Sequence, residues 1–151
     1  MIPYGRQDIT QDDIDAVVSV LKSDYLTQGE MAPKFEQAIS NKVLANYAVA
    51  VNSATSALHI ACLSLELNEG DYLWTVPNTF VASANCGLYC GAKIDFVDID
   101  HVTYNISIKE LSKKLKKAAK NNTLPKIIIP VAFSGLSLSL IHISEPTRQE
   151  A

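Results

Sequence analysis

The sequence contains no apolar run of the roughly eighteen residues that a membrane-spanning helix needs, so it predicts no transmembrane segment. Residues 1–8 also lack the apolar core of a signal peptide. The formal net charge of −3 gives no basic excess that would favour nucleic-acid binding. We therefore expect a cytoplasmic protein that binds neither membranes nor nucleic acid.

Several short functional signatures are absent as well. Neither G-x-x-x-x-G-K-[ST] nor G-x-G-x-x-G occurs, which argues against the common nucleotide-binding loops. There is no H-E-x-x-H motif, and Cys62, Cys86 and Cys90 do not have the spacing of a zinc site. An odd number of cysteines favours small buried thiols in a reducing compartment, and the alternative is a redox or metal role.

The chain does have enough apolar sequence for a folded domain, since 48% of its 151 residues are hydrophobic and 19% are charged. Its first part predicts two amphipathic helices. The first is capped by Thr10 and runs to about Ser23, and the second starts near Pro33. Apolar side chains recur on one face of each helix at helical spacing, at Ile14, Val17, Val18 and Leu21 and then at Phe35, Ile39 and Val43.

From Tyr47 onward, predicted strands and helices alternate. The pattern predicts strands at residues 47–51, 72–76, 92–99 and 126–133, with helices at 55–65, 79–89 and 107–120 between them. Repeated strand–helix units of this length predict an α/β fold, a three-layer sandwich with a mostly parallel sheet. The six lysines between Lys109 and Lys120 indicate a solvated helix face rather than a binding patch.

Residues 52–56 form the principal candidate site. In parallel sheets, ligands bind outside the carboxyl ends of the strands, and this small polar turn follows a predicted strand. It also opens a helix, whose unpaired N–H groups and dipole attract an anion. We expect a cofactor phosphate here. The alternative is that Ser53 or Thr55 only caps the helix.

Two further strand ends carry polar or aromatic residues that can converge on the same edge of the sheet. Phe80 follows the second predicted strand and is suited to stack on a flat heteroaromatic ring, although ordinary core packing is the alternative. Asp98 and Asp100 follow the third strand, and we expect a strand-end and turn role for them.

Five motifs occur in order along the chain: Tyr-Gly-Arg-Gln (4–7), Leu-Thr-Gln-Gly (26–29), Asn-Ser-Ala-Thr-Ser-Ala-Leu-His (52–59), Thr-Phe-Val-Ala-Ser-Ala-Asn (79–85) and Asp-Phe-Val-Asp-Ile-Asp (95–100). On these motifs, residues 2–135 resemble the N-terminal part of the DegT/DnrJ/StrS sugar aminotransferases, pyridoxal-phosphate enzymes of fold type I, and within them the transaminases of pseudaminic acid synthesis. The resemblance implies that residues 1–135 are an incomplete large domain of that fold.

The resemblance implies roles for residues at matching positions. Backbone N–H groups of Thr55 and Ser56 would hold the phosphate of pyridoxal 5′-phosphate, and Phe80 would stack on its pyridine ring. The positions that would line the nucleotide-sugar site are Tyr4, Asp24, Tyr25, Leu26, Thr27 and Ala54.

The implied reaction moves an amino group, usually from glutamate, to C4 of a UDP-linked 4-keto-6-deoxy sugar, in a protein that is typically a homodimer. It needs a Schiff-base lysine and a carboxylate beside the ring nitrogen. In the family both lie beyond the strand that matches residues 126–133, so we name no catalytic lysine and expect this chain alone to be inactive. The alternatives are a non-catalytic sugar-binding member, a sugar dehydratase variant, and an unrelated nucleotide-binding domain.

The resemblance ends after Gly135. Residues 139–151 look like translated sequencing-adapter DNA, so we expect residues 136–151 to be a sequencing or gene-model artefact rather than part of the domain. The alternative is a short edge strand, because Leu136, Leu138 and Leu140 alternate.

Overall fold

The structure is a computed structural model that describes residues 5–138, and the chain divides into two units, residues 1–50 and 51–151. Each unit is described by itself. Within residues 5–138, no helix is both long and apolar enough to cross a membrane.

The first unit contains two helices, α1 (Gln11–Leu21) and α2 (Met31–Val43). Thr10 caps α1 as predicted: its hydroxyl accepts the Asp13 N–H, and its own N–H donates to the Asp13 carboxylate over 2.8 Å. The bond from the Thr10 N–H, followed by one that the Thr10 hydroxyl donates to the same carboxylate, lowers the pKa of Asp13. Pro33 is the third residue of α2, within the first turn, where its missing N–H costs no helical hydrogen bond.

The second unit is built around a parallel sheet of three strands in the order β2-β1-β3. Trp74 of the central strand lies opposite Asp95 on one side and Ile128 on the other. The predicted parallel α/β fold is therefore confirmed. Its elements are α3 (Ala54–Ser64), β1 (Tyr72–Thr75), α4 (Ala82–Tyr89), β2 (Lys93–Phe96), α5 (Ile108–Asn121), β3 (Ile127–Ile129) and a 3-10 turn at Phe133–Gly135.

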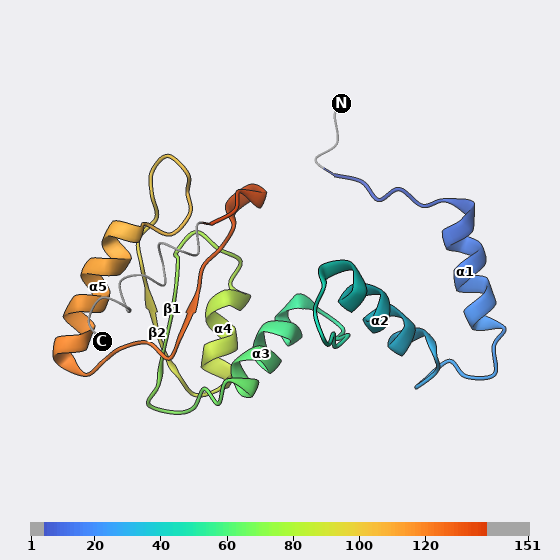
Figure 1. The fold of residues 1–151 in the computed structure, drawn as a ribbon, viewed down its shortest axis with the longest axis horizontal. Helices are drawn as coiled ribbons and strands as arrows, with labels where there is room; N and C mark the ends of the chain where they lie inside the picture. The colour runs from blue at the N-terminus through green and yellow to red at the C-terminus, as the bar shows by residue number, and fades with distance from the viewer. Residues whose placement is uncertain (1–4, 139–151) are drawn as a thin grey trace. The chain divides into compact units, whose positions relative to one another are not determined.

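Helices cover both faces of this sheet, with α3 and α4 on one side and α5 on the other (Figure 1). Because side chains alternate along a strand, Trp74 and Val76 point to the α5 side, where they pack with Leu111 and Ala118. Leu73 points to the other side, where it packs with Cys62, Leu67, Cys86 and Ala92. The two cores complete the predicted three layers.

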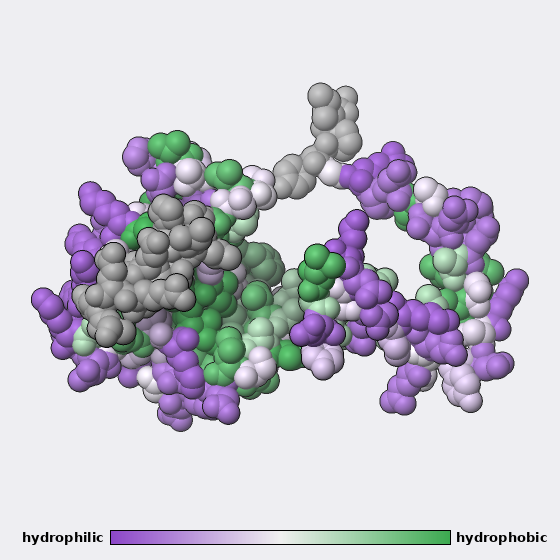
Figure 2. All heavy atoms as spheres, in the orientation of Figure 1, coloured by the Kyte–Doolittle hydropathy of each residue, from purple (hydrophilic) through white to green (hydrophobic). Residues whose placement is uncertain are grey.

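Helix α5 begins as expected, since the Ser107 hydroxyl accepts the Glu110 N–H over 3.4 Å. Its inner face buries Leu111 and Ala118, and hydrophilic side chains cover its outer side (Figure 2). The prediction of a solvated lysine face is confirmed for five of the six lysines, which are exposed. Lys114 is the exception, because its side chain is only 25% exposed.

The predicted strand at residues 47–51 is wrong. These residues belong to no strand, and Tyr47 and Val49 are 88% and 74% exposed. Alternating apolar residues predict a strand only if a neighbouring strand accepts its backbone hydrogen bonds, and none of the described residues does so. The Ala50 N–H instead donates to the Glu36 carboxylate over 2.8 Å. The turn at 52–56 therefore does not follow a strand of the described sheet.

Several other elements are shorter than predicted. The strands β1, β2 and β3 end earlier than their apolar runs, and Ile99 forms only an isolated antiparallel bridge with Ile106. Helix α4 starts three residues after the predicted position, so Thr79 and Phe80 lie in the loop before it. Residues 136–138 are not in a strand, and residues 139–151 lie outside the described residues.

The three cysteines meet where α3 packs against α4. Cys62 and Cys86 are buried, and Cys90 is half-buried. Burial, together with the neighbouring Cys86 thiol, raises the pKa of Cys62 to about 12, so this thiol stays protonated and unreactive at neutral pH. No group of three potential metal ligands occurs among the described residues. The interpretation as buried structural thiols fits this packing.

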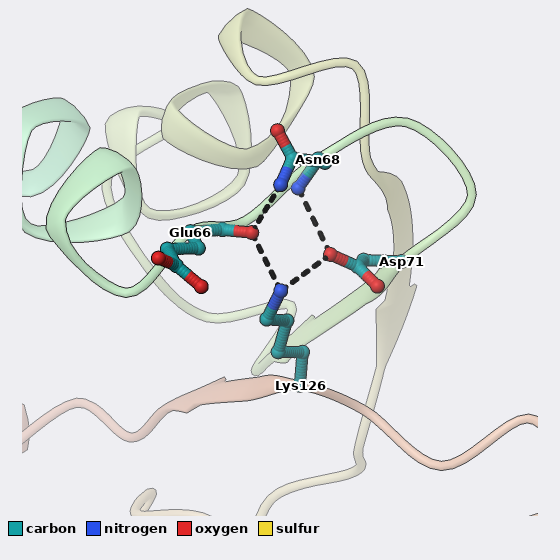
Figure 3. Close-up of polar contacts among 4 residues, drawn as sticks. All are labelled: Glu66, Asn68, Asp71 and Lys126. Carbon is teal, nitrogen blue, oxygen red and sulfur yellow. Dashed lines mark hydrogen bonds and ion pairs between the residues drawn. The ribbon is translucent and has the colours of Figure 1, made fainter.

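Lys126, immediately before β3, forms polar contacts with the loop that connects α3 to β1 (Figure 3). Its ammonium donates to the Glu66 carbonyl and forms an ion pair of 3.1 Å with Asp71. The same Asp71 oxygen accepts the Asn68 N–H over 2.9 Å. This bond has the largest effect in lowering the pKa of Asp71, and the hydrogen bond from Lys126 lowers it further. The turn at residues 68–71 is thus linked to Lys126, which lies 55 residues after Asp71 in the chain.

Replacing Lys126 with Met should lower the Tm by about 4 °C, because it leaves the Glu66 carbonyl and the Asp71 carboxylate without their shared cation. Thermal unfolding followed by circular dichroism measures the change. Lys116→Met is the matched control, since Lys116 is exposed on α5 and forms no ion pair with the described residues. Equal Tm values for the two variants would contradict the role of Lys126.

Candidate functional site

The start of α3 is held by a small network of polar side chains. Ser53 is the capping residue: it has extended backbone angles (φ −161°, ψ 158°), and its hydroxyl accepts the Ser56 N–H over 3.2 Å. The Ser56 hydroxyl in turn donates to the Asn52 side-chain carbonyl over 2.6 Å. Of the two predicted caps, Ser53 is therefore the one observed, and Thr55 is the second residue of the helix.

This helix start also retains donors for an anion. The N–H groups of Ala54 and Thr55 make no hydrogen bond to any described residue, as expected for the first turn of a helix. The Ser56 N–H, by contrast, is occupied by the Ser53 hydroxyl. Ala54 is exposed, and Thr55 and Ser56 are half-exposed. The donor set fits a phosphate group, with Ala54 and Thr55 as its two unoccupied N–H donors.

Phe80 lies in the loop between β1 and α4 and is 75% exposed. The alternative that it packs in the core is therefore wrong, and its ring is accessible to a ligand. The loop is held to the first turn of α4 by a hydrogen bond of 2.8 Å between the Thr79 and Ser83 hydroxyls. Helices α3 and α4 pack together and both end near the amino ends of the strands, so they start toward the opposite, carboxyl edge (Figure 1). In parallel α/β sheets, ligands generally bind at that edge.

The two aspartates after β2 have turn roles, as expected. The Asp100 carboxylate accepts the N–H groups of Val102 and Thr103 over 3.0 and 2.9 Å. Both bonds lower the pKa of Asp100, and the bond from Thr103 has the larger effect. Asp98 accepts the N–H of Ile99 over 2.8 Å. Both carboxylates are therefore engaged in shaping the loop that follows β2.

Asn105 joins two loops of the sheet, and no sequence motif indicates this because its partners lie far along the chain. It is only 5% exposed, and its side-chain carbonyl accepts the Phe133 N–H over 2.8 Å. Its amide group donates to the Leu136 carbonyl over 3.2 Å. The ring of Tyr104 lies 5.5 Å from that of Phe133. One buried side chain thus ties the loop after β2 to the turn after β3 at the carboxyl edge.

Asn105→Ala should lower the free energy of unfolding by about 1–3 kcal/mol, because it leaves two backbone groups without their partner. It should also speed hydrogen exchange of the Phe133 amide. Denaturant unfolding and amide exchange by NMR measure the two effects. Asn41→Ala, which removes an exposed amide on α2, is the control. If Asn105→Ala matched this control in both measurements, Asn105 would have no positioning role.

The remaining predicted site residues lie apart from the start of α3 in the chain. Asp24, Tyr25, Leu26 and Thr27 form an exposed loop of the first unit, with Tyr25 and Leu26 73% and 63% exposed. Tyr4 lies outside the described residues. Ala54, the remaining predicted substrate position, adjoins the predicted phosphate donor Thr55 at the start of α3.

Comparison with known proteins is consistent with this geometry. The sequence profile of the DegT/DnrJ/EryC1/StrS aminotransferase family matches residues 7–149. The chain is 42% identical, over 95% of its length, to a UDP-4-amino-4,6-dideoxy-N-acetyl-β-L-altrosamine transaminase of Campylobacter jejuni. It is 36% identical, over 92% of its length, to the spore coat polysaccharide biosynthesis protein SpsC of Bacillus subtilis. It spans 37% and 34% of these two proteins.

Solved structures show the same fold. Helicobacter pylori PseC, an aminotransferase involved in the biosynthesis of pseudaminic acid, superimposes with a TM-score of 0.85 at 30% identity, over 97% of this chain and 38% of PseC. Spr1654 from Streptococcus pneumoniae, solved in forms with PLP and with PMP, gives a TM-score of 0.87 at 27% identity, over 99% of this chain and 36% of Spr1654. The similarity covers both units of the chain.

Proposed function

The chain belongs to the DegT/DnrJ/EryC1/StrS aminotransferase family, and from this we propose that it forms the phosphate-holding part of a pyridoxal 5′-phosphate site in a nucleotide-sugar aminotransferase. The observation that carries the proposal is the start of α3. There Ser53 caps the helix while the Ala54 and Thr55 N–H groups remain without partners among the described residues.

The proposed reaction is the transfer of an amino group from glutamate to C4 of a UDP-linked 4-keto-6-deoxy sugar, on the route to pseudaminic acid. The 42% identity to the Campylobacter transaminase and the fold shared with PseC support this substrate class. When bound, pyridoxal 5′-phosphate supplies an electron sink for the amino transfer.

The residues of this chain would bind and orient. We assign phosphate binding to the N–H groups of Ala54 and Thr55, and to Ser56 when the Ser53 hydroxyl gives way to the anion. The exposed Phe80 ring would cover one face of the pyridine ring. Tyr4 and the loop from Asp24 to Thr27, together with Ala54, would line the nucleotide-sugar side.

The catalytic lysine and the acidic partner of the ring nitrogen are proposed to lie outside this sequence, in a cytoplasmic homodimer assembled from the complete protein. The purified 151-residue chain is accordingly expected to show no transamination between glutamate and a 4-keto nucleotide sugar. Coupled detection of 2-oxoglutarate measures this. Turnover above a heat-denatured control would contradict the assignment. It would also place the reactive lysine within the chain.

Thr55→Asp distinguishes a phosphate site from a simple helix cap. A carboxylate in the first turn suits the helix dipole, so the variant should fold at least as stably as the wild type, yet it should repel phosphate. Calorimetric titration with pyridoxamine 5′-phosphate and with pyridoxamine isolates the phosphate contribution, and neither compound forms a Schiff base with surface lysines. We expect the wild type to prefer the phosphorylated compound by about tenfold or more and Thr55→Asp to lose this preference.

Gln11→Glu is the matched control, because it adds the same charge to the first turn of α1 and should leave the preference intact. An unchanged preference in a folded Thr55→Asp variant would refute phosphate binding at α3, as would a wild type that binds both compounds equally.

A further inference from the structure

Strand β2 forms one edge of the described sheet, since the order of strands is β2-β1-β3. An edge strand presents backbone N–H and C=O groups that have no neighbour, and such groups readily pair with a strand from another chain. Proteins usually protect these edges by charged side chains, bulges or covering elements. The backbone groups on the outer side of β2 are therefore open to pairing with another chain unless other groups of the protein occupy them.

The hydrogen bonds to β1 show which residues of β2 face outward. The Lys93 N–H donates to the Asp71 carbonyl, and the Val97 N–H donates to the Thr75 carbonyl, each over 2.8 Å. In a parallel ladder alternate residues bond to the same neighbour, so Asp95 also faces β1. The N–H and C=O groups of Ile94 and Phe96 consequently face away from the sheet.

Both outward groups of Phe96 are occupied by side chains. Its N–H donates to one oxygen of the Asp95 carboxylate over 2.8 Å, and its carbonyl accepts from the Lys114 ammonium. The other oxygen of Asp95 lies 2.7 Å from the same ammonium. One ion pair thus takes the two positions that a neighbouring strand would use. Farther along, the Asp98 carbonyl accepts the Ser107 N–H over 2.9 Å.

Lys114 extends from α5 to the edge of the sheet and packs against the core. Its side chain is 25% exposed, whereas the adjacent Lys113 is 78% exposed and forms an ion pair with Glu110. The ammonium lies 4.8 Å from the centroid of the Trp74 ring, and Trp74 is buried in the core beneath it. Trp74, Asp95 and Lys114 also line a pocket of about 520 Å³ between β2 and α5.

The charge of Asp95 is maintained as well. Partial burial raises its pKa, but the hydrogen bonds from Lys114 and from the Phe96 N–H, with the charge of Lys114, outweigh burial and leave the pKa below its ordinary value. The carboxylate is therefore ionised at neutral pH and stays paired.

We propose that the Asp95–Lys114 ion pair closes the outer edge of β2 against pairing with the β2 strand of a second copy of this chain. With Phe96 occupied, only Ile94 offers outward backbone groups within β2, and one residue is too short for a ladder. A second copy is the expected partner, because two identical edges can pair symmetrically about a two-fold axis.

Lys114→Met tests the proposal, since Met keeps an apolar stem over Trp74 but has no ammonium to donate to Phe96 or to pair with Asp95. Lys113→Met is the matched control on the same helix, with the same change in charge. Sedimentation velocity over a concentration series should show a dimer Kd about tenfold lower for Lys114→Met than for Lys113→Met. Comparing the two variants cancels association through other parts of the surface.

Hydrogen exchange locates the contact. In Lys114→Met the Ile94 and Phe96 amides should gain protection as concentration rises, and Lys114→Arg, which restores the donors, should behave like the wild type. A folded Lys114→Met variant that sediments like Lys113→Met would overturn the proposal, and so would protection gained elsewhere but not in β2.

A second measurement needs no variant. In dilute wild-type protein, the Phe96 amide should exchange more slowly than the Ile94 amide. Equal rates would also overturn it.

Discussion

The pairing of β1 with both β2 and β3 is the interaction on which the second unit depends. Leu73 and Trp74, successive residues of β1, are almost wholly buried on opposite faces of the sheet, so this one strand supplies both cores. Its position also fixes the loop that carries Phe80 and the start of α4. The connection from α3 into β1 is in turn fastened by Lys126, so the helix bearing the candidate phosphate site is anchored at its far end.

The cofactor binding proposed for this framework depends on backbone groups rather than on reactive side chains. The Ala54 and Thr55 N–H groups are presented by a helix that packs against α4, and Ser53 caps its first turn. The loops after β2 and β3 are joined by Asn105, so the carboxyl edge is shaped by buried polar contacts. Such a surface is suited to hold and orient a cofactor whose chemistry is completed by other groups.

Local features of the fold were predictable from the sequence. The Thr10 and Ser107 caps, the apolar periodicity of the helices and the three apolar runs of the sheet all depend on residues close together in the chain. The predicted strand at residues 47–51 was wrong because a strand requires a partner that local pattern does not reveal. Lys114 and Asn105 were missed for a related reason, since their partners lie 18 to 31 residues away. The exposure of Phe80 likewise depends on where α4 begins.

The central claim is that the start of α3 holds the phosphate of the cofactor. The most direct measurement is a titration of the ¹⁵N-labelled chain with pyridoxamine 5′-phosphate, followed by the amide chemical shifts. The largest shifts are predicted for Ala54, Thr55 and Ser56, with no comparable change when pyridoxamine is added. Shifts concentrated at the first turn of α1 or α5, or the same response to both compounds, would contradict it.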